Sequence, residues 1–450
     1  MKIENSPLVG PSRKRPGAMR WRRWLRRRLR SPLTILRRRI ATGAGAILLS
    51  LAALLFATAG DRAQRVFAAF STQWPLATLA WTPLLFAGIA WSTRRWFGEA
   101  RGSGIPQVIA AGRQPERSGR SALVSLRTAM AKFGLTVAML LGGASVGREG
   151  PTVQISASIM VGVHRLLGVP ITSGVLIAGG AAGVAAAFNT PLAGVAFAIE
   201  ELAAAYEQRV AVLVMGAVMI SGMVSLGLAG DYLYFGAMRD ILPVGTVLLA
   251  APVVGIAGGL AGGCFSRLVL AMSGSARRPW AVARARPVRL AALCGLVVGL
   301  LGVASGGATW GTGYEATRAM VEGHGGPLWF GPAKLVATLA TTWSGTPGGI
   351  FAPSLATGAG VGNLLSPIFP AAPPGTIVLL GMAAYFVGVV RAPFTAVIIL
   401  IETTASRGMI LPLFATALLA DAVSARVCRE RLYHGLARAF ARHDHEERAG

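Results

Sequence analysis

Two stretches of this chain match each other at a fixed offset of 202 residues, and each carries a short glycine-rich loop that ends in proline. The loops are GREGP at 147–151 and GIFAP at 349–353. The same offset relates identical residues around the loops: Lys132 and Lys334, Gly143 and Gly345, Gly179 and Gly381, Pro191 and Pro393, and Glu200 and Glu402. Two matching halves with interrupted helices are typical of membrane transporters, whose site lies where the halves meet.

The composition also indicates a membrane protein. Hydrophobic residues make up 53% of the chain and charged residues 14%, whereas soluble proteins carry about a quarter charged residues. Several nearly uncharged runs reach the ~20 residues that a helix needs to cross a bilayer, and others are shorter and broken by Gly or Pro. Broken backbone at membrane depth must be buried in protein or line a wet cavity. We therefore expect an all-α integral membrane fold without strands.

The net charge of +26 is unevenly spread, with basic residues concentrated towards both ends. The predicted parts are a basic arm at 1–40, a transmembrane domain at 41–425 with halves at about 41–230 and 241–425, and a tail at 426–450. Basic flanks stay cytoplasmic, so we expect a multi-pass protein of the cell inner (plasma) membrane with both termini inside. The arm is either an interfacial helix on anionic membrane lipid or a disordered topology signal.

Other functional classes find little support in the sequence. Cys264, Cys294 and Cys428 stand alone, so neither a metal site nor a disulfide framework is indicated, and no cofactor is expected. Nucleic-acid binding is not expected, because nothing foldable accompanies the basic arm. An embedded enzyme would have to rely on Glu149 and Glu200, and no nucleophile–base pair or phosphate-binding lysine motif accompanies them. A lipid scaffold that works through the arm remains a further alternative.

Three loops are candidates for binding an anion. GSGIP at 102–106 places free backbone N–H groups and the Ser103 hydroxyl at the start of a helix, although such a motif is often only a flexible turn. The loop 147–151 repeats this design, with Arg148 before Glu149 and Gly150 after it. The third loop offers the backbone N–H groups of Ile350 and Phe351, whose apolar side chains would shield an anion from water.

Glu149 places a carboxylate within the second of these loops. An ionised carboxylate could occupy an anion cradle, and its protonated form could leave it. Burial favours protonation and N–H donors favour the charged form, so the two influences oppose each other and make a switchable acid. The alternative interpretation is a glutamate that caps its own helix and pairs with Arg148.

Four further residues carry polar chemistry near apolar runs. Glu200 and Glu201 are adjacent and cannot share one helix face, and Glu402 repeats Glu200. The Glu200 and Glu402 pair therefore suggests a shared structural role, whereas Glu201 has no counterpart and is the better proton-relay candidate. Its alternative is an interfacial glutamate at a helix end. The Tyr433 hydroxyl can donate to an anion, or the ring can belong to an interfacial aromatic belt.

Together these motifs resemble the CLC family of chloride channels and proton-coupled chloride exchangers. GSGIP, GREGP and GGIFAP at 348–353 stand in the family's order, and FNTPLAGVAFAIEE at 188–201 and RAPFTAVIILIE at 391–402 extend the match. The resemblance covers about residues 80–430 and implies the CLC fold of two inverted-repeat halves of tilted, broken helices. It also implies a homodimer in which each subunit has its own anion pathway. We expect a bacterial-type member without C-terminal CBS domains.

The resemblance assigns roles residue by residue. Glu149 is the external gating and proton glutamate, and Glu201 is the internal proton glutamate. The expected chloride-binding residues are Ser103, Ile350, Phe351, Tyr433, Arg148 and Gly150. Serine at 103 is the family's chloride-type choice, nitrate-preferring members tend to carry proline there, and fluoride-selective members lack this GSGIP form. Gln107 and Ile109 replace carboxylates that many members carry, so Lys132 needs a different partner.

The leading hypothesis is secondary active exchange of chloride for protons. Retention of Glu201 resembles the exchangers, since channel members usually lose that carboxylate. The alternative is a passive voltage- or pH-gated chloride channel on the same fold. On either hypothesis the protein is not an enzyme, and its partners are chloride, protons, membrane lipid and a second copy of itself.

Overall fold

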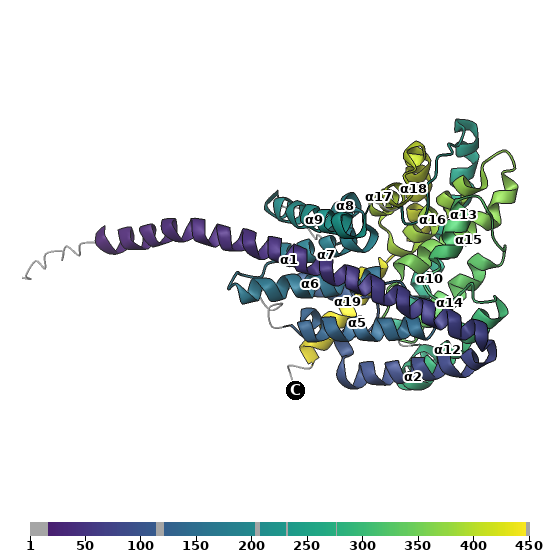
Figure 1. Ribbon diagram of the computed structural model, residues 1–450, viewed down its shortest axis with the longest axis horizontal. Helices are drawn as coiled ribbons and strands as arrows, with labels where there is room; N and C mark the ends of the chain where they lie inside the picture. The colour runs from purple at the N-terminus through teal and green to yellow at the C-terminus, as the bar shows by residue number, and fades with distance from the viewer. Residues whose placement is uncertain (1–16, 114–120, 203–207, 231–232, 276, 447–450) are drawn as a thin grey trace, which may run out of the picture.

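The computed structural model describes residues 17–113, 121–202, 208–230, 233–275 and 277–446 (Figure 1). Side chains are described from Ile35 to Phe440, except at 208–209 and in the gaps between these ranges. The arm's first 16 residues, the side chains of its arginines up to Arg30, and the last four tail residues lie outside this description. In the described ranges the regular structure is helical, apart from two isolated β-bridges. The all-α prediction is confirmed there.

The helices fall into two series that follow the sequence repeat. The first comprises α1 (Gly17–Gln73), α2 (Thr78–Trp96), α3 (Ile105–Gly112), α5 (Leu126–Leu141), α6 (Glu149–Leu166), α7 (Ser173–Phe188), α8 (Pro191–Phe197), the π-helical turn η4 (Ala198–Leu202) and α9 (Gln208–Ala229). The second comprises α10 (Val244–Gly274), α11 (Arg278–Ala285), α12 (Pro287–Ala304), α13 (Tyr314–Val321), α14 (Phe330–Trp343), α15 (Phe351–Leu365), α16 (Pro374–Val390), α17 (Pro393–Thr404) and α18 (Ile410–Val427). The last helix, α19, spans Leu432–Glu446.

Five short 3-10 turns connect these helices. They are η1 (Pro75–Ala77), η2 (Gly98–Ala100), η3 (Ala122–Val124), η5 (Ser366–Ile368) and η6 (Arg407–Met409). The chain between the two series, from Gly230 to Pro243, has no helix in its described part, as the predicted polar connection requires.

The two halves break their helices at equivalent residues. Asn189 ends α7 with φ +56°, and Arg391, 202 residues later, ends α16 with φ +65°. A left-handed residue closes a helix, and a proline two residues on fits the first turn of the next. Pro191 and Pro393 accordingly begin α8 and α17. The repeat seen in the sequence is therefore also a repeat of backbone conformation.

Each half also caps a helix of the other. The carboxylate of Glu402 accepts hydrogen bonds from the backbone N–H groups of Leu192 and Ala193 at 3.1 and 2.7 Å, at the start of α8. The carboxylate of Glu200 does the same at the start of α17, from Phe394 and Thr395 at 3.1 and 2.7 Å. A negative group at a helix N-terminus satisfies bare N–H groups and the helix dipole. This reciprocity agrees with the structural role predicted for the pair.

Close helix packing explains many of the glycines. A Cβ added to Gly262 of α10 would lie 2.7 Å from the backbone of Gly388 in α16, and one added to Gly358 of α15 would lie 2.6 Å from Gly381 O. Small residues let membrane helices approach until their backbones touch. The α10, α15 and α16 helices form the centre of the second half in this way.

Six described helices are long and apolar enough to cross a membrane: Ile35–Gln73, Pro75–Trp96, Val210–Ala229, Val244–Gly274, Pro287–Ala304 and Arg407–Val427. Figure 1 shows α1 running across the body of the first half and projecting beyond it at its N-terminal end. The predicted tail, by contrast, folds back. Helix α19 packs against α3 and α10, and its first residues, Leu432 and Tyr433, are fully buried.

The reciprocal caps predict a measurable loss of stability. Glu402→Ala removes the acceptor for two N–H groups of α8, so the free energy of unfolding should fall by about 1–3 kcal/mol. Thermal unfolding in detergent measures the change. Glu315→Ala, at an exposed position of α13, is the matched control and should leave the melting temperature unchanged. Equal melting temperatures for the two variants would contradict the capping role.

Candidate functional site

Backbone hydrogen bonds join the three predicted loops at one point. Gly147 and Gly349 exchange a pair of N–H to C=O bonds, both 2.8 Å long. Gly102 N donates to Thr346 O at 3.2 Å, and Gly348 N donates to Gly102 O at 3.1 Å. Helices α3, α6 and α15, which begin directly after these loops, therefore start side by side. We call this junction of residues 102–106, 147–151 and 346–353 the cradle.

Glycine is required where the loops meet. A Cβ on Gly349 would lie 2.9 Å from Gly147 O and 3.1 Å from Gly150 N. Gly104 has φ +107°, and a Cβ there would lie 2.7 Å from Gly150 O. Side chains at these positions would push the three backbones apart, so the glycines are the condition for the junction.

The cradle presents hydrogen-bond donors that the protein itself does not use. Helices α3, α6 and α15 have no side-chain cap, so part of each first turn keeps bare N–H groups. The hydroxyl groups of Ser103 and Tyr433 are buried and lie close to each other, and neither makes a hydrogen bond of good geometry with the described residues. Buried polar atoms are normally paired, and so many convergent free donors fit an anion.

A cavity of about 350 Å³ opens onto this point. Ser103, Tyr433 and Ile350 line it together with Gly348 and Gly349. Its lining also includes three basic side chains, Arg94, Arg101 and Arg284. A cleft with one sign of charge raises the local concentration of the opposite ion. The cavity therefore suits the approach of an anion to the cradle.

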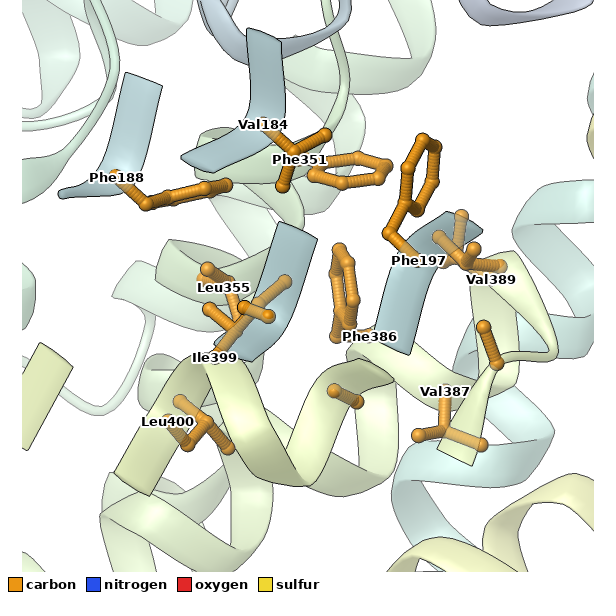
Figure 2. Packing of buried hydrophobic residues seen from close by; sticks show 14 of the residues in the cluster. Val184, Phe188, Phe197, Phe351, Leu355, Phe386, Val387, Val389, Ile399 and Leu400 are labelled. Atoms are coloured by element: carbon orange, nitrogen blue, oxygen red, sulfur yellow. The ribbon is translucent and has the colours of Figure 1, made fainter. Parts of the chain in front are cut away.

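Aromatic side chains seal the cradle on another side. Phe351 is fully buried, and its ring lies 4.8 to 6.3 Å from those of Phe386, Phe197, Tyr433 and Phe188 (Figure 2). Phe351 belongs to α15, Phe386 to α16, Phe197 to α8, Tyr433 to α19 and Phe188 to α7. The predicted apolar shield of Phe351 is present, and low polarity around the N–H groups strengthens their contacts with a charge.

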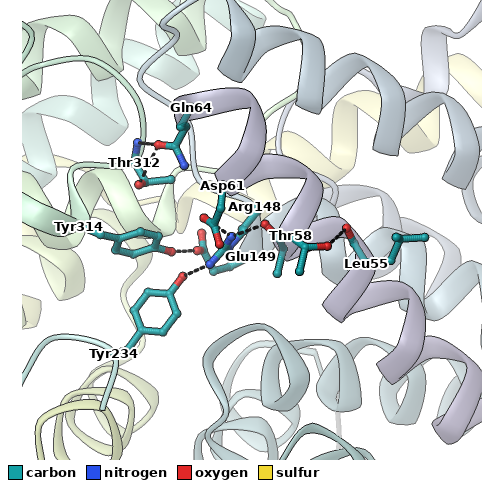
Figure 3. Close-up of polar contacts among 10 residues, drawn as sticks. Leu55, Thr58, Asp61, Gln64, Arg148, Glu149, Tyr234, Thr312 and Tyr314 are labelled. Atoms are coloured by element: carbon teal, nitrogen blue, oxygen red, sulfur yellow. Dashed lines mark hydrogen bonds and ion pairs between the residues drawn. The ribbon is translucent and has the colours of Figure 1, made fainter. Parts of the chain in front are cut away.

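Glu149 lies inside the cradle and not on the surface. It is the first residue of α6 and is fully buried. Oε2 accepts from the backbone N–H of Ala352 at 3.4 Å, in the first turn of α15, and Oε1 accepts from the Tyr314 hydroxyl (Figure 3). The carboxylate thus uses an amide of the helix start that an anion would need. Sequence reasoning missed Tyr314, which follows a glycine turn in the second half.

Arg148 has a different role from the one suggested by its place in the loop. Its guanidinium donates to Asp61 Oδ1 at 2.6 Å, Ala57 O at 2.7 Å and the Tyr234 hydroxyl at 2.8 Å. Figure 3 shows Asp61 on α1 and Tyr234 on a loop, on either side of Arg148. The side chain is thus held by α1 and pairs with neither Glu149 nor the free donors. Any contact of Arg148 with an anion would have to come from its backbone.

The remaining predicted residues hold the loops in place. Lys132 Nζ donates to the backbone oxygens of Ala100 at 2.8 Å and Gly102 at 2.5 Å, directly before Ser103. The different partner expected for Lys132 is therefore the backbone. Gln107, which replaces a carboxylate, donates to Arg101 O at 2.6 Å. Gly150 lies beside Ser103, whose hydroxyl oxygen would be 2.4 Å from a Cβ on Gly150.

Lys334 repeats the arrangement of Lys132 in the second half. Its Nζ donates to Thr309 O at 2.9 Å and Gly311 O at 2.7 Å. These carbonyls precede Tyr314, the partner of Glu149. Each half therefore has a buried lysine that fixes a loop near the cradle. Lys132 fixes the loop that carries the Ser103 hydroxyl, and Lys334 fixes the loop that leads to the Tyr314 hydroxyl.

The adjacent carboxylates Glu200 and Glu201 are separated as predicted. Glu200 caps α17, whereas Glu201 is fully buried and its oxygens accept no hydrogen bond from the described residues. The Nε2 atom of His434 lies 3.8 Å from Glu201 Oε1. Nothing in the sequence pointed to His434 except its place next to Tyr433.

Comparisons with known proteins agree with this geometry. The family model "Voltage gated chloride channel" matches residues 84–425, most of the chain. The chain belongs to this family. The CLC fold is shared with a slow cyanobacterial Cl⁻/H⁺ antiporter, at 23% identity and a TM-score of 0.75 over 90% of this chain and 98% of that one.

Two further CLC structures show the same fold. A eukaryotic CLC transporter matches at 22% identity and a TM-score of 0.70, over 90% of this chain and 74% of that one. A CLC-type fluoride/proton antiporter matches at 22% identity and 0.72, over 88% and 98%. The chain is thus a multi-pass membrane protein of a family that moves anions, and not an enzyme.

The cradle of this CLC protein makes a prediction about Gly349. In Gly349→Ala the added methyl group must separate the two paired loops, at a strain cost of about 1–3 kcal/mol. The strain distorts the cradle that an anion would occupy, so anion affinity should weaken by roughly 10- to 100-fold. Calorimetric titration of halide in detergent measures it.

Gly134→Ala in α5 is the control, since no atom lies within 4 Å of its added Cβ. This variant should bind halide like the unaltered protein. Unchanged affinity in Gly349→Ala would show that the paired loops are not part of the binding site.

Proposed function

We propose that this protein is a proton-coupled chloride antiporter, which performs secondary active H⁺/Cl⁻ exchange. The observation that carries the proposal is the position of Glu149. Its carboxylate accepts from Ala352 N in the cradle, where the free donors of Ser103 and Tyr433 also converge. A titratable group placed among anion-binding amides couples the binding of one ion to the protonation of the other.

Electrostatic repulsion between chloride and the Glu149 carboxylate enforces the coupling of chloride to protons. Two negative charges about 4 Å apart repel each other by about 4 kcal/mol at an effective dielectric constant near 20. A chloride ion in the cradle therefore favours either displacement or protonation of Glu149. A side chain that is both gate and proton carrier can release chloride and accept a proton in one cycle. It does so without opening a continuous path through the protein.

Proton and anion need separate inner routes, and two features support this. The cavity at Ser103 and Tyr433 has a basic lining that suits an anion. Glu201 does not line it, and it is buried with His434 as its neighbour. In this proposal the ions share the outer stretch through Glu149, and the proton leaves or arrives through Glu201.

Chloride as the anion rests on the form of the first loop. The chain has Ser103 within GSGIP, the chloride-type choice in the family, and fluoride-selective members lack this form. The Ser103 and Tyr433 hydroxyls supply two side-chain donors to a dehydrated halide, and Ile350 and Phe351 supply backbone N–H groups. No cofactor is part of the proposal.

We place the protein in the cell inner membrane as a homodimer with cytoplasmic termini. Arg37, Arg38 and Arg39 lie at the very start of the first spanning helix, Ile35–Gln73, and Arg426 and Arg429 lie at the end of the last, Arg407–Val427, and just after it. Basic flanks of this kind stay on the cytoplasmic side. All cradle groups come from one chain, so each subunit would carry its own pathway. Single-molecule photobleaching in vesicles counts the subunits, and a single step would refute the dimer.

The main alternative is a passive chloride channel, and one measurement distinguishes the two. An exchanger's reversal potential under a fixed chloride gradient changes with the pH gradient, whereas a channel's does not. We expect a pH-dependent reversal potential in planar bilayers. Retention of a buried Glu201 favours the exchanger.

Removing the gate carboxylate should uncouple the two ions. Glu149→Ala leaves the cradle to chloride alone, so chloride flux continues and proton uptake driven by a chloride gradient disappears. Proteoliposomes with simultaneous chloride and pH recording test this. Glu315→Gln, an exposed carboxylate in α13, serves as control and keeps normal coupling. Continued proton uptake by Glu149→Ala would refute the assignment.

The internal glutamate makes a separate prediction. Glu201→Gln keeps the side chain's size and removes its proton exchange, so chloride flux persists while proton transport stops. The adjacent Glu200→Gln changes only the cap of α17 and should retain the ratio of protons to chloride. A coupled Glu201→Gln protein would mean that protons take another route.

A further inference from the structure

Glu201 needs an intermediary if it is to exchange protons with the cytoplasm. Its side chain has no exposed surface, and neither carboxylate oxygen accepts a hydrogen bond within the described ranges. A buried carboxyl group that titrates during transport must still receive and release protons. The groups around it therefore decide how a proton reaches it.

His434 is placed to serve this purpose. It lies in the first turn of α19, directly after Tyr433, and its Nε2 is 3.8 Å from Glu201 Oε1. The histidine side chain is 30% exposed, so one end of the ring meets solvent while the other faces the buried carboxyl group. One bridging water or a small rotation closes a gap of this length.

The hydrogen bond on the other ring nitrogen sets the tautomer. Arg113, at the end of α3, has its Nη2 atom 3.3 Å from His434 Nδ1. Guanidinium groups only donate, so in the neutral ring Nδ1 accepts and the ring proton resides on Nε2. The neutral tautomer thus points its N–H at Glu201.

The charges around His434 keep the ring neutral at rest. Burial lowers the pKa of His434, and the positive charges of Arg113, Arg431 and Arg438 lower it further. Glu201 faces the ring from η4, with Glu200 next to it in the chain. A neutral imidazole with Nε2 towards the acid and Nδ1 in an exposed contact with Arg113 can pass a proton on without holding a charge, once Arg113 moves away from Nδ1.

We propose that His434 transfers protons between the cytoplasm and Glu201. In the inward step, a hydronium ion on the cytoplasmic side gives a proton to Nδ1 as Arg113 moves aside and leaves as water, and the Nε2 proton passes to the Glu201 carboxylate at Oε1. The ring has then gained one proton and lost one, and it remains neutral with its proton on Nδ1. Ring rotation or exchange with water restores the first tautomer. This inference rests on the proposed H⁺/Cl⁻ exchange.

The first test compares His434→Gln and His434→Ala in proteoliposomes that report chloride and pH together. The Gln amide can hold a polar contact like that of Nε2 but cannot relay a proton. Both variants should lower the ratio of protons to chloride by about tenfold or more, since positioned proton-transfer groups contribute on the order of 10²-fold or more. His324→Ala, at an exposed histidine after α13, should keep the normal ratio.

The second test leaves the histidine intact. Arg113→Gln frees Nδ1 and removes a positive charge, so the pKa of His434 rises and the pH of half-maximal proton transport moves upward. The shift should vanish when Arg113→Gln is combined with His434→Gln. An unchanged pH profile in Arg113→Gln overturns the proposal, even if the His434 variants fail to fold. A shift that persists in the double variant, which lacks His434, also overturns it.

The remaining outcomes are equally decisive. Normal coupling in His434→Gln with loss in His434→Ala would assign the residue a positioning role and overturn the relay. Normal coupling in both would overturn any role. If the unaltered protein moves chloride without protons, the exchange itself is refuted, and the relay falls with it. The wild-type recording therefore separates failure of the function from failure of the inference.

Discussion

The site depends on the two hydrogen bonds that Gly147 and Gly349 exchange. This pair joins the halves at equivalent residues and brings the starts of α6 and α15 to one place. A third helix start, that of α3, is attached through Gly102. Helix starts carry partial positive charge and bare N–H groups, so their convergence has to be balanced by a negative charge. In this structure the carboxyl group of Glu149 lies at this point and accepts a hydrogen bond from Ala352 N.

Much of the site could be predicted because the internal repeat shows which residues of the two halves are equivalent. The offset of 202 residues identified the loops and the Glu200 and Glu402 pair before any contact was known, and it reappears in the conformations of Asn189 and Arg391. Differences between the copies were equally informative. At this offset Glu149 aligns with Phe351 and Glu201 with Thr403, so these titratable groups of the first half have no titratable counterpart in the second.

The parts that escaped prediction are contacts between elements far apart in sequence. Tyr314 reaches Glu149 from α13, and Asp61 of α1 binds Arg148 over 87 positions. His434 meets Arg113 over 321 positions. No periodicity or local motif encodes such meetings, since they depend on how whole helices pack. The same reason explains Arg148, whose sequence neighbours suggested an anion contact and whose side chain is held by α1 instead.

The exchanged caps have a consequence for how the protein is made. Helix α8 leaves the ribosome long before Glu402, whose carboxylate caps it, because Leu192 precedes Glu402 by 210 positions. Until Glu402 is made, the first turn of α8 lacks the acceptor for the N–H groups of Leu192 and Ala193. Neither half therefore has its full set of helix caps by itself, and the first half can reach its final structure only after the second has been synthesised. A split gene would have to deliver both products to the same place at the same time.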